Sequence, residues 1–167
     1  FISIFLSFAN GAINNGVIKY TAEYEDDDEK LKSLFSTSLK ISLFFSSIVG
    51  IILILFASYF ANAILLANYF VNPIRILGFT IILYSLNSLF ISILNGKKQI
   101  KTYTVVNTAG SLIGLLFTVI LVYYFKLEGA LYALVLSQTI VFFVTFFMIL
   151  KSDWFSCDYF RQTIDIE

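Results

Sequence analysis

The chain has 167 residues, of which 59% are apolar and 13% are charged, and its formal net charge is zero. That apolar share is well above the roughly 45–50% of ordinary soluble domains, and the balanced charge argues against a nucleic-acid partner, which requires a basic surface. Because the chain has no histidine and one cysteine, we expect no metal site, no cofactor and no enzymatic chemistry.

Apolar segments follow one another along the whole sequence. A helix rises about 1.5 Å per residue, so roughly 20 residues cross the ~30 Å hydrocarbon layer of a bilayer. We therefore predict an all-α fold, a polytopic membrane helical bundle with about five transmembrane helices. The predicted membrane helices are residues 1–18, 34–60, 74–95, 102–125 and 129–150.

The first of these segments contains two Asn-Gly pairs, Asn10-Gly11 and Asn15-Gly16. Glycine and asparagine weaken a helix, and a break at membrane depth is tolerated only where the freed backbone is buried or faces a water-filled cavity. We therefore predict a break close to a transport pathway. The segment also begins at Phe1 without a flanking charge, and the only methionine is Met148, so we expect the chain to be a fragment.

Basic residues alternate between the two predicted sides of the membrane. Lysine and arginine accumulate in short cytoplasmic loops, which places the loops at 19–33, 96–101 and 151–167 in the cytoplasm and the amino end outside. If the intact protein starts in the cytoplasm, at least one helix precedes this chain. The predicted cytoplasmic side carries Lys19, Lys30, Lys32, Lys97, Lys98, Lys101, Lys151 and Arg161, and the opposite side carries Arg75 and Lys126.

Several helix boundaries are marked by local signals. The acidic residues 23–29 lack the spacing of a calcium loop, and their aspartates are expected to cap a helix that begins near residue 28. Asn72-Pro73 is expected to be an N-cap followed by the first helical residue, and Asn95-Gly96 is expected to end that helix. The short segment 126–129 requires antiparallel neighbours, and residues 61–71 are expected to lie along the outer interface.

Polar residues recur at helical spacing inside the membrane segments. Such stripes either bond helices together or line a solute pathway, and both readings stay open. Asn107 and Gln138 are candidate substrate-binding residues on two of the stripes. Gly110 and Gly114 form a GxxxG pair, which indicates close helix packing. The stripes are Ser85, Ser88 and Ser92, then Thr104, Asn107, Ser111, Gly114 and Thr118, then Gln138 and Thr145.

Two charged residues lie close to the predicted hydrocarbon layer. Lys40 is about two turns into the predicted membrane segment 34–60, and its side chain either extends to the cytoplasmic headgroups or faces a central cavity as a fixed positive charge. Arg75 is one turn into its helix on the outer side. It is either a headgroup anchor or a bidentate partner for a diphosphate.

The sequence from Asn15 to Tyr24, Asn-Gly-Val-Ile-Lys-Tyr-Thr-Ala-Glu-Tyr, resembles the N-G-V-x-K-Y-x-A-x-Y signature of the O-antigen and lipid III flippases. The resemblance extends over essentially the whole chain, through Asn95-Gly96 with its basic loop and Leu127-Glu128-Gly129-Ala130-Leu131. It implies that residues 1–167 are a partial amino-terminal lobe, helices two to six, of a transporter with two six-helix lobes around a central cavity.

The resemblance also implies a function. Flippases of this kind translocate undecaprenyl-diphosphate-linked oligosaccharides, such as the O-antigen units of lipopolysaccharide, across the bacterial inner membrane by alternating access. Lys19 occupies the lysine position of the signature and is a candidate substrate-binding residue, with Lys40 and Arg75 added from their placement. The expected partners are the lipid-linked substrate, the bilayer and other membrane proteins of polysaccharide assembly.

Two alternatives remain from the residues themselves. A drug or cation antiporter of the same superfamily needs a membrane-embedded Asp or Glu. None of the predicted membrane helices contains either residue. A membrane-bound glycan-assembly enzyme needs groups that act as acid, base or nucleophile, and the carboxylates of this chain fall in the predicted loops.

Overall fold

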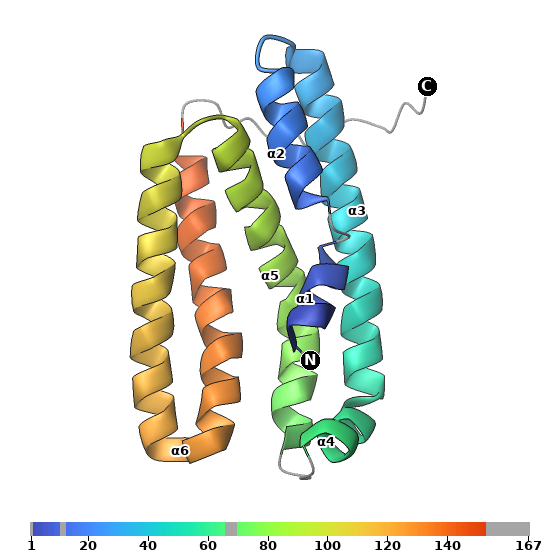
Figure 1. The fold of residues 1–167 in the computed structure, drawn as a ribbon, viewed down its shortest axis with the longest axis vertical. Helices are drawn as coiled ribbons and strands as arrows, with labels where there is room; N and C mark the ends of the chain where they lie inside the picture. Colours follow the sequence, from blue (N-terminus) through green and yellow to red (C-terminus); the bar gives the residue numbers. More distant parts are fainter. Residues whose placement is uncertain (1, 11–12, 66–69, 153–167) are drawn as a thin grey trace.

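The computed structural model describes residues 2–10, 13–65 and 70–152, and every element in these ranges is an α-helix (Figure 1). The predicted all-α fold is therefore confirmed. The helices are α1 (Ile2–Ala9), α2 (Asn14–Glu23), α3 (Asp28–Leu55), α4 (Ala57–Leu65), α5 (Val71–Gly96) and α6 (Ile100–Leu150).

Three of these helices, α3, α5 and α6, are long and apolar enough to cross a membrane. Helix α6 has 51 residues, about 77 Å at 1.5 Å per residue, which is far longer than a bilayer is thick. It reverses direction at Lys126, whose φ of 53° and ψ of −127° are non-helical. The two arms of α6, residues 100–125 and 127–150, run side by side, as predicted for a very short turn (Figure 1).

The observed boundaries match most of the local signals. Helix α3 begins at Asp28, with Asp27 as an N-cap whose carboxylate accepts a hydrogen bond of 3.1 Å from the backbone N–H of Lys30. Helix α5 ends at Gly96, as expected. The turn between α2 and α3 covers only residues 24–27, so the predicted loop at 19–33 is mostly helical. Most of the predicted loop at 151–167 lies outside the described residues.

The predicted N-cap at Asn72 is wrong. Helix α5 begins at Val71, and its N-cap, Phe70, makes no side-chain capping bond. The first four N–H groups of a helix have no intrahelical partner, so Pro73 is tolerated in the first turn without having to be its first residue.

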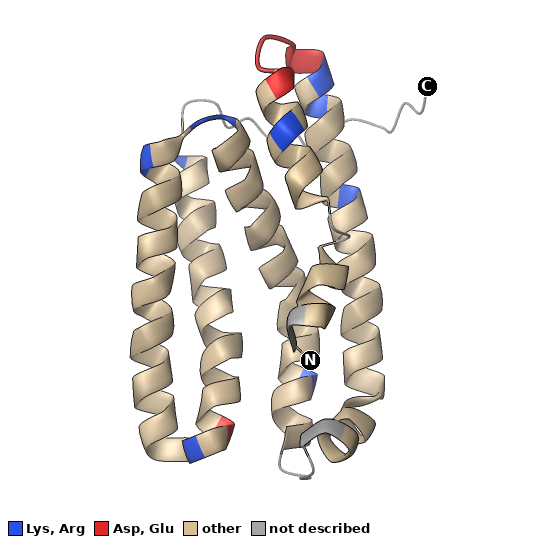
Figure 2. Cartoon of the chain, in the orientation of Figure 1, with Lys and Arg blue, Asp and Glu red and all other residues tan. Residues whose placement is uncertain are grey.

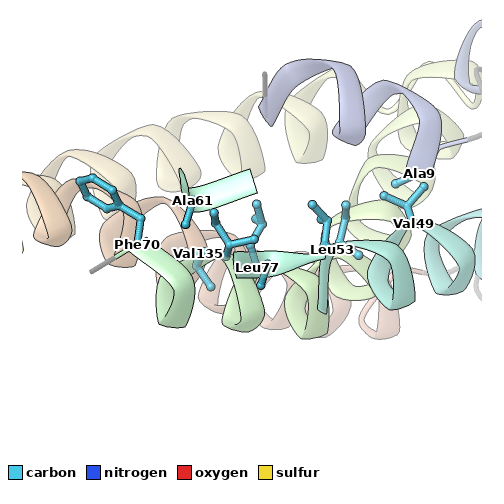
Figure 3. Close-up of a cluster of buried hydrophobic side chains, with 10 residues drawn as sticks. Ala9, Val49, Leu53, Ala61, Phe70, Leu77 and Val135 are labelled. Atoms are coloured by element: carbon cyan, nitrogen blue, oxygen red, sulfur yellow. The ribbon is translucent and has the colours of Figure 1, made fainter. Parts of the chain in front are cut away.

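Helix α5 is the centre of the bundle, because it packs against each of the other described helices. Two apolar clusters surround it. The first joins α1, α3, α4, α5 and the second arm of α6, and it includes Val49, Leu53 and Leu77 (Figure 3). The second joins α2, α3, α5 and both arms of α6, and it includes Phe35 and Ile93. The bundle therefore has an apolar cluster in each half.

Two glycines, one on α3 and one on α5, let these two helices pack closely against each other. A Cβ atom added at Gly50 would lie 2.6 Å from the carbonyl oxygen of Gly78, and one added at Gly78 would lie 2.9 Å from the carbonyl oxygen of Gly50. Small residues at such a crossing let two membrane helices approach until their backbones touch. The two glycines are far apart in the sequence, and periodicity along either helix does not pair them.

Candidate functional site

A polar layer, formed by Asn10, Asn14, Ser42, Ser85 and Ser88, separates the two apolar clusters. On α3, Ser42 lies between Phe35 of one cluster and Val49 of the other. On α5 the two serines fall between residues that belong to the two clusters in the same way. The layer therefore crosses the bundle near the middle of α5, at a depth where polar groups need protein partners.

The predicted break in the first membrane segment lies in this layer. Helix α1 ends at Ala9 and α2 begins at Asn14. The break frees the carbonyl of Ala9, and the hydroxyl of Ser85 donates to that oxygen at 3.0 Å. The same hydroxyl lies 2.6 Å from the hydroxyl of Ser42. Helix α5 thus supplies a hydrogen bond to the carbonyl that the break frees, and Ser42 of α3 contacts the same serine hydroxyl.

Ser88 forms a second link between the break and α5. Its hydroxyl oxygen accepts a hydrogen bond of 2.7 Å from the amide of Asn14, and the amide of Asn10 lies 3.4 Å away. The asparagines that flank the break are therefore both directed to one serine of the central helix.

Ser88 also borders a cavity of about 320 Å³ between α5 and the two arms of α6. Asn107 and Gln138, the two candidate residues on the polar stripes, line this same cavity from opposite arms of α6. The described residues that line it carry no formal charge. They are Tyr84, Asn87, Ser88, Ile91, Val106, Asn107, Gly110, Ser111, Gln138 and Val141.

Asn87 differs from the other polar residues of the cavity. Its side chain is 4% exposed, and its Oδ1 atom has no hydrogen-bond partner among the described residues. By contrast, the amide of Asn107 donates to the carbonyl of Tyr103 at 2.9 Å, and the hydroxyl of Ser111 donates to the carbonyl of Asn107 at 2.9 Å. The carboxamide of Asn87 thus retains unused hydrogen-bonding capacity.

The polar stripes reach this cavity only in part. Asn107 and Ser111 line it, whereas Thr104 and Thr118 of the same stripe are exposed elsewhere on α6. Thr118 donates to the carbonyl of Gly114 at 2.7 Å, four residues earlier on its own helix. A hydroxyl that bonds its own helix needs no partner helix, and this explains why the periodicity overestimates the inward face.

The GxxxG expectation also fails at one of its two positions. A Cβ atom at Gly110 would lie 3.3 Å from a methyl carbon of Val141, but one at Gly114 would meet nothing within 4 Å. The two arms of α6 approach each other at the first glycine and not at the second.

The three cationic candidates lie apart from the cavity. Lys19 on α2, Lys40 on α3 and Arg75 on α5 are all exposed, and none of them is among the residues that line the cavity. The ammonium of Lys19 lies 5.4 Å from the ring centre of Tyr20, which is within the range of a cation–π contact. The structure therefore places Asn107 and Gln138 in one cavity and places these three cations outside it.

Most charged residues gather at one end of the bundle, where α2 turns into α3 and α5 turns into α6 (Figure 2). Lys98 and Glu25 join the two turns through a salt bridge of 2.6 Å. Lys98 holds the pKa of Glu25 below its ordinary value, and Glu25 raises the pKa of Lys98. Burial lowers the pKa of the neighbouring Lys97.

Sequence reasoning missed Tyr84 and Asn87. The sequence does contain a signal for them. Tyr84, Asn87 and Ser88 stand at positions i, i+3 and i+4 of α5, and residues at this spacing share one helix face. Counting only hydroxylated residues placed Ser88 in a stripe with Ser85 and Ser92. Those two serines are instead buried, and Ser92 bonds the carbonyl of Ser88 on its own helix.

Comparison with known proteins agrees with the family resemblance of the sequence. A family model described as "Polysaccharide biosynthesis protein" matches residues 1–165. The lipid III flippase of Escherichia coli (strain K12) and that of Shigella flexneri are each 25% identical to the chain over 169 aligned residues. Those alignments cover 98% of the chain and 39% of each relative, so the chain spans well under half the length of these curated relatives. No solved structure matches the chain.

Proposed function

Because the chain belongs to the polysaccharide biosynthesis protein family, we propose that it forms part of a transporter that moves a lipid-linked oligosaccharide across a membrane. The observation that carries this proposal is the alignment of 98% of the chain with proteins named as lipid III flippases. In this proposal the chain is a partial amino-terminal lobe, and the protein carries out transport rather than enzymatic chemistry.

The interior of the bundle supports transport of a polar solute. A hydrocarbon environment penalises polar groups that lack partners, so a membrane bundle without a polar cargo has little reason to keep an open, uncharged polar cavity. Here Ser88 lines a cavity of about 320 Å³ and also bonds one end of a helix break, whose other end is bonded by Ser85. Broken helices with polar surroundings are common at the substrate sites of transporters.

The five candidate residues have different roles in this proposal. Lys19, Lys40 and Arg75 supply positive charge for the lipid diphosphate, because lysine and arginine form charge-assisted hydrogen bonds to phosphate oxygens. Asn107 and Gln138 contact the uncharged part of the cargo from the two arms of α6. The second lobe and a first helix, which the resemblance implies, would complete the pathway around them.

We also propose the cellular setting that follows from such a cargo. The substrate is an undecaprenyl-diphosphate-linked repeat unit of O-antigen or of a related surface glycan. The location is the bacterial inner membrane, where lipopolysaccharide units are assembled before export. Other membrane proteins of polysaccharide assembly are the candidate partners.

Complementation of a flippase-null strain tests this function. The full-length protein should restore surface polysaccharide, whereas the Lys19→Ala, Lys40→Ala double variant should restore much less at an equal amount of membrane protein. The Lys→Arg versions should be partly active, because they keep the charge. Failure of the unaltered protein to restore any glycan would contradict the proposed function. Full export by the double variant would reduce both lysines to interfacial anchors.

A further inference from the structure

We infer that the cavity between α5 and α6 is a subsite for an uncharged sugar unit, with Asn87 as a residue that recognises its hydroxyl groups. This inference rests on the proposed function and specifies which part of the cargo the cavity receives. The diphosphate of the same cargo binds elsewhere.

The size of the cavity fits a sugar unit. Its volume of about 320 Å³ is near the lower end of the ~300–1,000 Å³ of small-molecule sites. It is also about ten times the ~30 Å³ that one water molecule occupies in the liquid. A single bare cation is too small to fill such a space.

The hydrogen-bonding groups of the cavity favour hydroxyl ligands. A carboxamide carries both a donor and an acceptor, and a sugar hydroxyl can serve either of them. The carboxamide of Asn87 is buried beside the cavity, and its oxygen is unpartnered among the described residues. Since an unsatisfied buried polar group is costly, a ligand hydroxyl that reached this amide would gain more than one that met a paired group.

The neighbouring groups have less to offer. The hydroxyl of Ser111 already donates to the carbonyl of Asn107, so it presents only an oxygen acceptor to the cavity. The amide of Asn107 uses one of its two N–H groups on the carbonyl of Tyr103, which leaves one N–H and the amide oxygen. Acceptor oxygens attract the O–H groups of a sugar and repel the oxygens of a phosphate. The ring of Tyr84 adds an aromatic wall on which the C–H face of a sugar can lie.

The charge of the cavity argues against the diphosphate. A diphosphate carries only acceptor oxygens at neutral pH, and it needs cations or clustered N–H donors. The described lining of the cavity contains no lysine, arginine or acidic residue. The cationic candidates Lys19, Lys40 and Arg75 all lie outside that lining, so charge and sugar recognition are separated in space.

Cysteine protection tests the inference on the full-length protein in membranes. In a cysteine-free background, Ser111→Cys places a reporter in the cavity, and Thr118→Cys places a matched reporter on the exposed part of the same arm. The two probes are lipid-linked oligosaccharide extracted from the host and the prenyl diphosphate that bears no sugar. We expect the glycolipid alone to slow maleimide labelling at position 111, and neither lipid to change labelling at position 118.

Other outcomes overturn the inference and leave the proposed function standing. Equal protection by both lipids would place the diphosphate or the prenyl chain in the cavity. Protection by neither lipid, in a Ser111→Cys protein that still exports glycan, would show that the cargo does not enter. Failure of the proposed function is distinguishable, because the unaltered protein would then export nothing.

Substitution of Asn87 supplies a second measurement. Asn87→Leu should lower glycan export roughly 3- to 10-fold at equal membrane protein, as expected for the loss of a hydrogen bond. Asn87→Gln should recover part of the loss. Asn95→Leu, on the exposed end of the same helix, is the matched control and should export normally. Full export by Asn87→Leu would remove Asn87 from the site.

Discussion

At the scale of single residues, the contact between Gly50 and Gly78 shows what holds α3 to α5. Lipid tails are as apolar as leucine, so burial from water does not drive two helices together inside a membrane, and close packing has to do so. A Cβ atom at either glycine would lie within 3.0 Å of a backbone carbonyl oxygen of the facing helix, which cannot rotate away as a side chain can. The two positions therefore fix the distance between the helices.

Gly78→Ala should destabilise the bundle, whereas Gly114→Ala should not. The new methyl group at position 78 would lie 2.7 Å from Ile54 Cγ1 and 2.9 Å from the carbonyl oxygen of Gly50, and overpacking of this kind costs about 1–3 kcal/mol. A methyl group at position 114 meets nothing within 4 Å. Thermal unfolding of the two full-length variants in detergent measures the difference, and equal melting temperatures would contradict the proposed contact.

At the scale of helices, the junction of α1 and α2 shows how a broken helix is accommodated at membrane depth. The hydrogen bonds come from α5, through Ser85 to the carbonyl of Ala9 and through Ser88 to the side chain of Asn14. The break is therefore not a local property of α1 and α2. Any movement that straightens this segment must first separate it from α5.

Ser85→Ala should weaken this junction more than Ser92→Ala. Removal of the hydroxyl at position 85 leaves the carbonyl of Ala9 without its donor, at a cost of about 1–3 kcal/mol. Ser92 is equally buried, but its hydroxyl bonds only the carbonyl of Ser88 on its own helix. Labelling of Asn10→Cys by a membrane-permeant thiol reagent compares the variants. Unchanged labelling in the Ser85→Ala protein would show that the bond does not hold the break closed.

The same elements show how far the sequence alone can lead. Apolar length, the Asp27 region and Asn95-Gly96 predict the helices and several of their ends, because these signals act within a few residues of the chain. The Asn-Gly pairs predict the break for the same reason. The pairing of Gly50 with Gly78, and of Asn87 with a cavity, depends on which helices become neighbours. Periodicity gives the face of a helix but not its partner, and Thr118 shows that a polar face need not point inward.

At the scale of the whole molecule, the salt bridge between Glu25 and Lys98 places two predicted cytoplasmic turns at the same end of the bundle. The bend of α6 at Lys126 lies at the opposite end (Figure 1). The relative arrangement of the turns thus agrees with the distribution of basic residues. Which end faces the cytoplasm is a prediction from the lysine bias.

An impermeant thiol reagent added to intact cells measures this orientation. Lys126→Cys should be labelled from outside, and Lys98→Cys should be labelled only after the membrane is opened. The reverse pattern would invert the topology. It would also move Lys19 and Lys40 from the cytoplasmic side of the membrane to the outer side.

The bridge between the two turns should depend on pH in a defined window. The pKa of Glu25 is lowered from 4.5, so its contribution is present above that value and is lost as the pH falls through the folded-state pKa. The pKa of Lys98 is raised from 10.5, so its contribution is present below that value and is lost at higher pH. Spin labels at Asp26→Cys and Lys101→Cys should show a broader distance distribution once the pH falls below the lowered folded-state pKa of Glu25.

The control for this measurement is Glu25→Gln, which should give the broader distribution at every pH. Because both partners are exposed, added salt should weaken the bridge near neutral pH as well. A distribution that stays narrow in acid would show that packing of the helices, rather than the ion pair, fixes the distance between the turns.

The bond from Ser85 to Ala9 also has a consequence for the order of synthesis. These residues are 76 positions apart, so the ribosome adds chain for about 4–15 s at roughly 5–20 residues per second before the capping hydroxyl exists. During that time the nascent break carries a carbonyl that only water or the insertion machinery can satisfy. The segment around Ala9 leaves the ribosome before α5 does, and it should therefore settle only after α5 has been made. Nascent chains arrested before residue 85 should expose an Asn10→Cys reporter that chains arrested beyond residue 150 protect.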